Sequence, residues 1–445
     1  MLTRTGYLVT EGPITEIKKD LTVRAQVNGD YGFPPPPFKV FRTAKNGVCV
    51  PRFYGVDKVG EPKEDRRPQP ARSKAKFVGQ LRDATHQNAA LAAALDAGHG
   101  VLSLPCGYGK TTVSLAIACA LGYRTMIVVH KQFLADQWRE RIQQFCPGAT
   151  IGIVQQDKKE TDCDFVIAML QSLSLKEYSF SDFDSVGTLI VDEAHHICAK
   201  VFSQSLFKMC PKHIFGLSAT PERKDGLTKV LHWFMGPTFF AVERKNQEQV
   251  EVFPVTYECF NYRNPPPSMR NGKVSMPNMI TEVVEDRKRN QMLVELIKKA
   301  SAGTRQLLVL SDRRWHCEML HQCFPKNSGL YMGGMKEADL QASSKKKIIF
   351  ATFSQAHEGL DIPTLDTVIL ASPKSDITQS IGRIMRETKG KKNNPHIYDI
   401  HDPWSLFTAM YYKRMRVYRQ GGFKIHGKVA EEEKKDFPQG KCLFL

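Results

Sequence analysis

The chain has 445 residues, of which 42% are hydrophobic, and its 63 lysines and arginines outnumber 46 aspartates and glutamates, which gives a formal net charge of +17. This apolar fraction excludes a disordered chain, and the length suffices for two or three domains. No apolar stretch is long enough to cross a bilayer, and residues 1–21 lack the apolar centre of a signal peptide. We therefore expect a soluble intracellular protein whose basic charge suits a polyanionic partner such as nucleic acid.

The eleven cysteines are not arranged as metal-binding pairs, because no two are spaced as C-x-x-C. Most of them stand within apolar runs. We expect reduced and mostly buried thiols, and no structural zinc site.

Taken in chain order, the pattern predicts a small β region, a linker and two α/β domains. Residues 1 to about 56 contain apolar runs broken by proline, which is typical of edge strands, and the polar residues 61–76 predict a linker. From about Phe77, β-rich runs such as TMIVVH and GTLIVDEA alternate with helical ones, and the alternation returns after about Glu251 with RQLLVLS and DTVILAS. This alternation predicts parallel sheets covered by helices.

The stretch LPCGYGKTTVSLAIA, residues 104–118, has the order of strand, glycine turn and helix that a phosphate loop requires. Gly107 and Gly109 would let the backbone approach an anion closely. Lys110 would reach the β- and γ-phosphates, and Thr111 would bind Mg²⁺ through its hydroxyl. The full eight-residue pattern is not met, because Leu104 stands where its first glycine would be. A tight packing turn is therefore the alternative.

Asp192 and Glu193 end the apolar run LIV in TLIVDEAHH. Asp192 would hold Mg²⁺ through its water shell, and Glu193 would orient and deprotonate the attacking water. In isolation, a helix cap or a surface strand end would explain the pair better. After a phosphate loop in the same unit, the catalytic interpretation is favoured. We expect His195 to couple motifs rather than bind a metal, and His196 to be structural.

Together these stretches resemble the motifs of the superfamily 2 helicases and translocases. PCGYGKTT resembles motif I, VDEAHH motif II of the DEAH type and GLSATPERKDG motif III, while QLLVLSDR, IIFATFSQAHEGLDIPTLDTVIL and QSIGRIMRET resemble motifs IV, V and VI. The resemblance covers roughly residues 77–422. Within the superfamily the sequence is similar to the XPB and UvsW group of double-stranded DNA translocases. It is most similar to helicases of large eukaryotic DNA viruses of the poxvirus transcript-release type.

The resemblance implies an α/β fold of two tandem RecA-like parallel-sheet domains with a small N-terminal β-rich accessory region. We expect that region and its linker in residues 1–76, the ATP-binding domain in residues 77–250, the second domain in residues 251–425 and a tail in residues 426–445. It also implies ATP and Mg²⁺ as cofactors and an ATP-dependent DNA helicase or translocase. Such a motor would move 3′ to 5′ on double- or single-stranded DNA as a monomer, in transcription, repair or recombination. A viral chain would be found in the host cytoplasm or the virion.

The resemblance assigns further residues to the nucleotide. Gln87 would read the adenine base. Arg383 and Arg386 of motif VI, one helical turn apart, would reach the γ-phosphate, with Gln379 on the same face as Arg383. The remaining expected nucleotide contacts are Tyr108, Gly109 and Thr112 of motif I, while Gly359 and Asp361 of motif V would contact either the nucleotide or the domain interface. In motif III, Ser218 and Thr220 would couple hydrolysis to domain closure.

Nucleic-acid contacts are less sharply indicated. By resemblance, the residues along the strand track would be Lys131, Gln137, Gln171, Ser172 and Thr352, whereas Trp138 is expected in the core. The helical stretch FTAMYYKRMRVYRQ suits a phosphate backbone and a packing interface equally well. The N-terminal region would serve either to grip DNA or a partner or as a structural cap. An RNA-directed helicase and a non-enzymatic binding subunit remain the competing classes.

Overall fold

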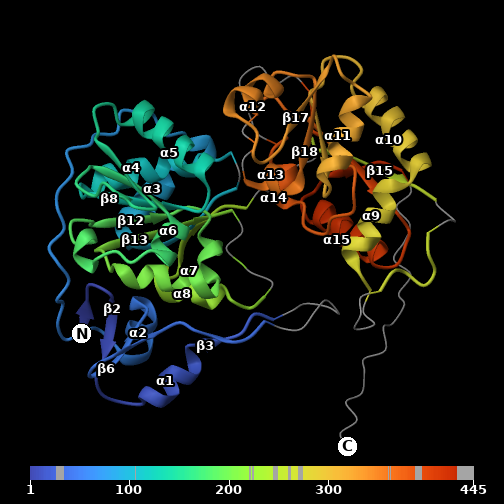
Figure 1. Ribbon diagram of the computed structural model, residues 1–445. Helices are drawn as coiled ribbons and strands as arrows, with labels where there is room; N and C mark the ends of the chain where they lie inside the picture. The colour runs from blue at the N-terminus through green and yellow to red at the C-terminus, as the bar shows by residue number, and fades with distance from the viewer. Residues whose placement is uncertain are drawn as a thin grey trace, which may run out of the picture. The chain divides into compact units, whose positions relative to one another are not determined.

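The structure is a computed structural model that describes residues 1–26, 35–105, 107–219, 222, 225–243, 249–258, 262–268, 274–358, 360, 362–385 and 393–427. The chain divides into two compact units, Met1–Glu243 and Arg244–Leu445 (Figure 1). Each is built around a mainly parallel sheet covered by helices, and a small antiparallel sheet lies at the N-terminus. The predicted fold class is thereby confirmed, while the predicted domain boundaries stay a prediction.

The sheet of the first unit has eight strands among the described residues, in the order β10-β9-β11-β8-β12-β13-β7-β14. Neighbouring strands are parallel except β10 with β9. The strands are β7 (His99–Ser103), β8 (Thr125–Val129), β9 (Ile151–Gln155), β10 (Lys158–Lys159), β11 (Phe165–Met169), β12 (Thr188–Val191), β13 (His213–Ser218) and β14 (Thr238–Ala241). Most of them are continuous apolar runs, as expected where both faces of a sheet are covered.

Alternate residues of the central strand β8 pack into different cores, because side chains alternate across a sheet. Ile127 and Val129 belong to one core, and Met126 and Val128 belong to the other. The first core includes residues of α3 (Gln87–Ala97), α4 (Lys110–Leu121) and α5 (Gln132–Phe145). The second includes residues of α6 (Leu170–Leu175) and α8 (Thr228–Met235), and α7 (Lys200–Ser203) lies between β12 and β13 in the chain.

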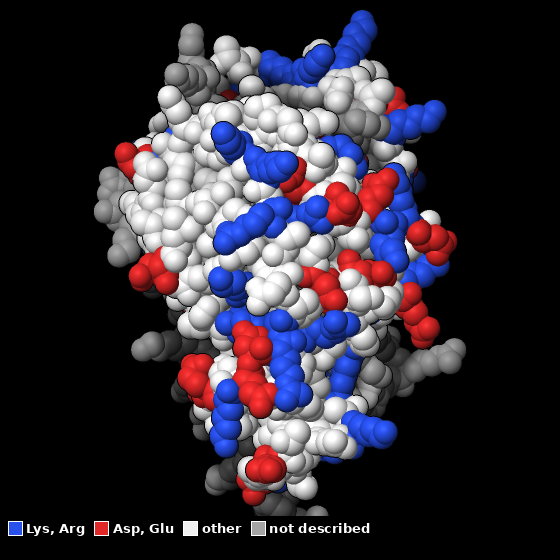
Figure 2. All heavy atoms as spheres, turned by 90° about the vertical axis from the view of Figure 1, so that its left-hand side faces the viewer, with Lys and Arg blue, Asp and Glu red and all other residues white. Residues whose placement is uncertain are grey.

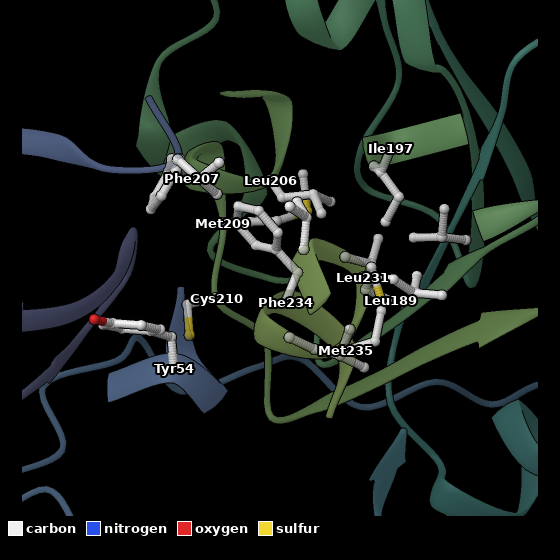
Figure 3. Close-up of a cluster of buried hydrophobic side chains, with 14 of the residues drawn as sticks. Tyr54, Leu189, Ile197, Leu206, Phe207, Met209, Cys210, Leu231, Phe234 and Met235 are labelled. Atoms are coloured by element: carbon white, nitrogen blue, oxygen red, sulfur yellow. The ribbon is translucent and has the colours of Figure 1, made fainter. Parts of the chain in front are cut away.

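The N-terminal region shares the second of these cores. Its described strands are β1 (Leu2–Thr3), β2 (Gly6–Val9), β5 (Arg42–Ala44) and β6 (Gly47–Val50), with a pair β3 (Thr22–Val23) and β4 (Phe38–Lys39) and helices α1 (Ile14–Asp20) and α2 (Arg52–Val59). Tyr54 of α2 meets the ring of Trp233 in α8 edge-on at 5.3 Å. It lies in one buried cluster with Phe207, Phe234 and Met235 (Figure 3). The region therefore packs as a cap on α8 and the eight-stranded sheet within the first unit.

The predicted linker is held against the first unit. The carboxylate of Asp164 accepts hydrogen bonds from Ser73 Oγ at 2.7 Å and from the backbone N–H of Lys74 at 3.0 Å. Figure 2 shows basic and acidic side chains interspersed over the side of the molecule that is on the left in Figure 1. Ion pairs such as Arg66 with Glu64 fit this mixture. The excess positive charge is therefore not gathered into one uniform field on that side.

The sheet of the second unit has seven strands among the described residues, in the order β17-β18-β16-β19-β20-β15-β21, and all its pairs are parallel. The strands are β15 (Glu251–Thr256), β16 (Leu307–Ser311), β17 (Ser328–Tyr331), β18 (Ile348–Thr352), β19 (Thr367–Leu370), β20 (His396–His401) and β21 (Lys424–Ile425). The helices are α9 (Met276–Glu285), α10 (Arg287–Ala300), α11 (Arg314–Gln322), α12 (Glu337–Ser344), α13 (Phe353–Glu358), α14 (Thr378–Gly382) and α15 (Leu406–Gln420).

Helix α15 is anchored in this unit by a buried ion pair. The guanidinium of Arg414 donates to both carboxylate oxygens of Asp399, with the shortest distance 2.6 Å, and Tyr418 donates to the same carboxylate. Arg416 and Arg419 of the same helix are exposed. Arg414 thus has a packing role, and only the outer edge of this helix is available to phosphates.

The described ranges contain no helix with both the length and the apolar character needed to cross a bilayer. The same ranges contain no group of three or more His, Cys, Asp or Glu side chains that could hold a metal ion. The described cysteines are free thiols, namely Cys49, Cys119, Cys146, Cys163, Cys198, Cys210, Cys317 and Cys323.

Candidate functional site

Motifs I, II and III of the first unit meet at the carboxyl edge of its sheet, which is the side where its parallel strands end. Strand β13 lies between β7 and β12, and all three run parallel, so their carboxyl ends lie at the same edge. Ser218 at the end of β13 pairs with Ser103 at the end of β7, and Val191 at the end of β12 pairs with Gly216. The carboxyl edge is where open α/β sheets bind their ligands.

The turn between β7 and α4 has the backbone that a phosphate loop needs. Gly107 and Gly109 have φ of 86° and 79°, a left-handed conformation that favours glycine. A Cβ atom on Gly109 would lie 2.4 Å from the side-chain nitrogen of Gln87. Helix α4 begins at Lys110, whose ammonium donates to the carbonyl of Leu104 at 3.0 Å. The free N–H groups of the helix start and this ammonium together fit a polyphosphate such as that of ATP.

Gln87 holds this turn from the neighbouring helix. Its side-chain N–H donates to the carbonyl of Tyr108 at 2.9 Å, and its side-chain oxygen accepts from the backbone N–H of Arg82 at 2.9 Å. The residue is only 1% exposed. The nitrogen end of the amide thus holds the turn and the oxygen end is fixed by Arg82, and the contact of Gln87 with adenine stays a prediction.

Asp192 is fixed by hydrogen bonds to both carboxylate oxygens. Trp138 Nε1 donates to Oδ2 at 2.9 Å, and the backbone N–H of Glu193 donates to Oδ1 at 2.9 Å. Burial and the charge of Glu193 raise the pKa of Asp192, whereas Trp138 and the nearby Lys110 lower it. Carboxylate and hydroxyl oxygens are ligands that Mg²⁺ prefers, so Asp192 and Thr111 fit the metal role assigned to them.

Glu193 occupies an unusual backbone conformation directly after the strand. Its φ and ψ are 45° and 53°, a left-handed geometry that costs a residue with a Cβ about 1–3 kcal/mol. Its Oε2 has no hydrogen-bond partner among the described residues and lies 3.5 Å from His195 Nδ1. His195 Nδ1 is in turn 3.4 Å from Ser218 Oγ of motif III. A carboxylate oxygen of this kind can accept a proton from water.

The predicted strand-track residues of the first unit also stand near the carboxyl edge. Gln171 follows β11 and donates from its side-chain nitrogen to the carbonyl of His130, which follows β8, at 2.5 Å. Ser172 Oγ accepts from the backbone N–H of Gln156 at 2.9 Å. Lys131 precedes α5, and burial lowers its pKa. Contact of these residues with nucleic acid stays a prediction.

The second unit carries the predicted residues of motifs V and VI. Gln379 is half-buried in α14, and Arg383 follows this helix and donates from Nε to the carbonyl of Ala356 in α13 at 2.8 Å. Thr352 Oγ1 lies 3.2 Å from Ser354 Oγ. Gly359, Asp361 and Arg386, and Thr220 in the first unit, lie outside the described residues. The nucleotide contacts assigned to motifs V and VI stay predictions.

Trp138 contacts Asp192, the predicted metal residue, in a way that its sequence context does not indicate. We expected a core residue, and the side chain is 1% exposed. Its indole N–H also orients Asp192, which stands 54 residues further along the chain. No spacing rule connects the two, because the contact depends on α5 covering the sheet next to β12.

Comparison with known proteins finds relatives that are named as helicases. A family model described as type III restriction enzyme, res subunit, matches residues 80–223. A protein of Acanthamoeba polyphaga mimivirus that is named as an ATP-dependent RNA helicase is 35% identical over 430 residues, which cover 90% of this chain and 81% of that protein. A protein of Invertebrate iridescent virus 6 that is named as a helicase is 28% identical over 379 residues, 78% of this chain and 82% of that protein.

A solved structure, the crystal structure of T4 UvsW, aligns over 93% of this chain and 94% of that chain. The sequence identity is 14% and the TM-score is 0.35, which are too low to infer fold or function from this alignment.

Proposed function

This chain belongs to the superfamily 2 helicases of large DNA viruses, and on that basis we propose that it is a motor that hydrolyses ATP as it moves along DNA. The meeting of motifs I, II and III at the carboxyl edge of one sheet carries the proposal. The resemblance of motifs III, V and VI to the double-stranded DNA translocases supports DNA as the track and 3′ to 5′ as the direction. The similarity of PCGYGKT, GLDIPTLD and GRIMRET to helicases of the poxvirus transcript-release type supports a role in viral transcription, such as transcript release, with repair and recombination as the alternatives.

In this proposal the residues at the carboxyl edge of the first unit's sheet have separate roles. Lys110 and the N–H groups of the turn bind the β- and γ-phosphates, and Thr111 and Asp192 hold Mg²⁺. Bound Mg²⁺ supplies charge neutralisation at the phosphate oxygens. Glu193 orients the attacking water and takes its proton, and His195 with Ser218 links this carboxylate to motif III. Arg383, Arg386 and Gln379 serve the γ-phosphate by resemblance to motif VI.

The test is ATP turnover measured side by side with duplex DNA, single-stranded DNA and RNA of one sequence. We expect turnover to rise most with DNA. Lys110→Ala and Glu193→Gln should abolish ATP hydrolysis. The matched controls are Lys158→Ala and Glu160→Gln, which alter an exposed ion pair at the outermost strand β10 and should leave hydrolysis unchanged. Turnover that none of the three nucleic acids stimulates would refute the motor, and unchanged turnover in Lys110→Ala would refute the site.

An RNA-directed helicase is the second candidate, because the mimivirus relative is named as an ATP-dependent RNA helicase. The same experiment separates the two. Stimulation by RNA without stimulation by either DNA would establish the RNA-directed enzyme. Displacement of a streptavidin block from the 5′ end but not the 3′ end of the tracked strand would support the 3′-to-5′ direction.

A further inference from the structure

Three imidazole rings lie in series beside the catalytic carboxylate. The ring of His130 is 4.1 Å from that of His196, and the ring of His196 is 4.4 Å from that of His195, measured between centroids. His195 Nδ1 lies 3.5 Å from Glu193 Oε2. We call His130, His196 and His195 the histidine stack. It leads from the end of β8 to the residue that we assign as the base.

The far end of the stack lies among the residues assigned to nucleic acid. His130 stands directly before Lys131, and its backbone carbonyl accepts the hydrogen bond from Gln171. Strand β8 lies between β11 and β12 in the sheet, so His130 occupies the position between Gln171 and the acidic pair. A shift of Lys131 or Gln171 would therefore act on the backbone of His130 without an intervening residue.

The ring nitrogens of His130 could form hydrogen bonds for which the described residues provide no partner. It is 7% exposed, and neither ring nitrogen has a partner among the described residues. Burial, with the nearby His196 and Lys131, lowers its pKa to about 3, so the ring is neutral with one donor and one acceptor. Leaving such groups buried and unpaired is costly, and a phenylalanine would fill the site without that cost.

Further unpaired polar groups lie at the two ends of the chain of contacts that leads from Gln171 through the histidine stack to Glu193. Within the described residues, Gln171 Oε1 and Glu193 Oε2 are also buried and without hydrogen-bond partners. One donor and three acceptors left unsatisfied along a single chain of contacts indicate an arrangement that can change to a second one in which they are paired. A coupling element requires two such arrangements, each favoured by a different ligand.

We propose that His130 is a positioning residue that couples nucleic acid at Lys131 and Gln171 to the orientation of Glu193 through the histidine stack. This inference rests on the proposed motor function. It concerns coupling and assigns His130 no contact with either ligand. Binding free energies are linked reciprocally, so the coupling is measurable without hydrolysis as the effect of nucleotide on nucleic-acid affinity.

The test compares oligonucleotide affinity with and without a non-hydrolysable ATP analogue and Mg²⁺. A fluorescent duplex DNA, single-stranded DNA and RNA of one sequence are titrated with the full chain, and the ratio of the two Kd values is the coupling factor. In His130→Phe we expect this factor to move toward one by about 2- to 30-fold relative to the unchanged protein. The same variant should have a higher Tm, because the unpaired polar atoms are gone. A purely structural role would not lower coupling while raising stability.

The matched control is His213→Asn, at the amino end of β13 on the opposite edge of the sheet. His213 is half-buried and bonds the carbonyl of Gly98 at 2.9 Å, so its loss alters stability and leaves the coupling factor unchanged. If His130→Phe does not fold, His196→Phe is measured in its place, with the same expectation for the coupling factor.

A coupling factor in the variant equal to that of the unchanged protein would overturn the inference and leave the motor intact. A factor of one in the unchanged protein, with all three nucleic acids, would instead overturn the proposed function.

Discussion

Replacing Trp138 with phenylalanine tests whether a buried indole orients the carboxylate that we propose binds Mg²⁺. The change keeps an aromatic ring in the core and removes the N–H that donates to Asp192 Oδ2 at 2.9 Å. The other oxygen, Oδ1, keeps its hydrogen bond from the backbone of Glu193. Asp192 would then be held by one oxygen and could rotate about its side-chain bonds, so its position toward Mg²⁺ would be less well defined.

The size of the expected effect on ATP turnover follows from the hydrogen bond that is lost. A hydrogen bond to a charged group contributes about 1.5–3 kcal/mol, which corresponds to about a 10- to 150-fold change in rate or affinity. We expect kcat/KM for ATP to fall within this range and the Mg²⁺ concentration for half-maximal turnover to rise. The loss of ring volume in a packed site also lowers the free energy of unfolding, by an amount that the control measures separately.

The assay is ATP turnover as a function of Mg²⁺ concentration, accompanied by Mn²⁺ binding measured by electron paramagnetic resonance in the presence of a non-hydrolysable analogue. Trp233→Phe is the matched control, because Trp233 packs against Tyr54 away from the carboxyl edge. If Trp138→Phe has the Mg²⁺ dependence and Mn²⁺ affinity of this control, the indole does not position Asp192 and the reasoning is refuted.

Further predictions concern stability and are read from equilibrium unfolding. Hydrogen bonds outweigh the effect of burial and lower the pKa of Asp164 to about 2. Asp164→Asn should therefore lower the free energy of unfolding by about 1–2 kcal/mol above pH 4, after allowance for solvent screening. This difference from the unchanged protein should vanish as the pH falls toward 2, where Asp164 becomes protonated in the folded state. Arg414→Met should destabilise by about 3–5 kcal/mol because it leaves a buried carboxylate unpaired, whereas the exposed Arg416→Met should change stability by less than about 0.5 kcal/mol. Tyr54→Ala should cost about 3–5 kcal/mol and expose the N-terminal cap to limited proteolysis, and an unaltered cleavage pattern would contradict the shared core.

The parallel sheets could be predicted because their strands are buried on both faces. Runs such as TMIVV and TLIV are continuously apolar, which is how a strand covered by helices reads in sequence. The N-terminal region could be predicted only as short strands. Its packing depends on partners far along the chain, as where Arg42 donates to the carbonyl of Gln204 across 162 residues.

Those parts of the site that lie on continuous segments could also be predicted. Gly109 and Lys110 stand together in one turn, and Asp192 and Glu193 end one strand, so local pattern suffices for each. The Trp138 contact and the histidine stack could not be predicted, because each depends on which strands are neighbours. Sequence periodicity does not give the strand order that places β8 beside β12.

The shared core also has a consequence for biosynthesis. The apolar residues of the first 54 positions, such as Leu21, Val48 and Tyr54, are buried in one cluster with Phe234 and Met235, which the ribosome adds much later. At about 5–20 residues per second, the nascent N-terminus therefore waits for many seconds before the surface that completes it has emerged. During that interval its apolar side chains are exposed to solvent, and a chaperone that binds nascent chains would find its target in these first residues.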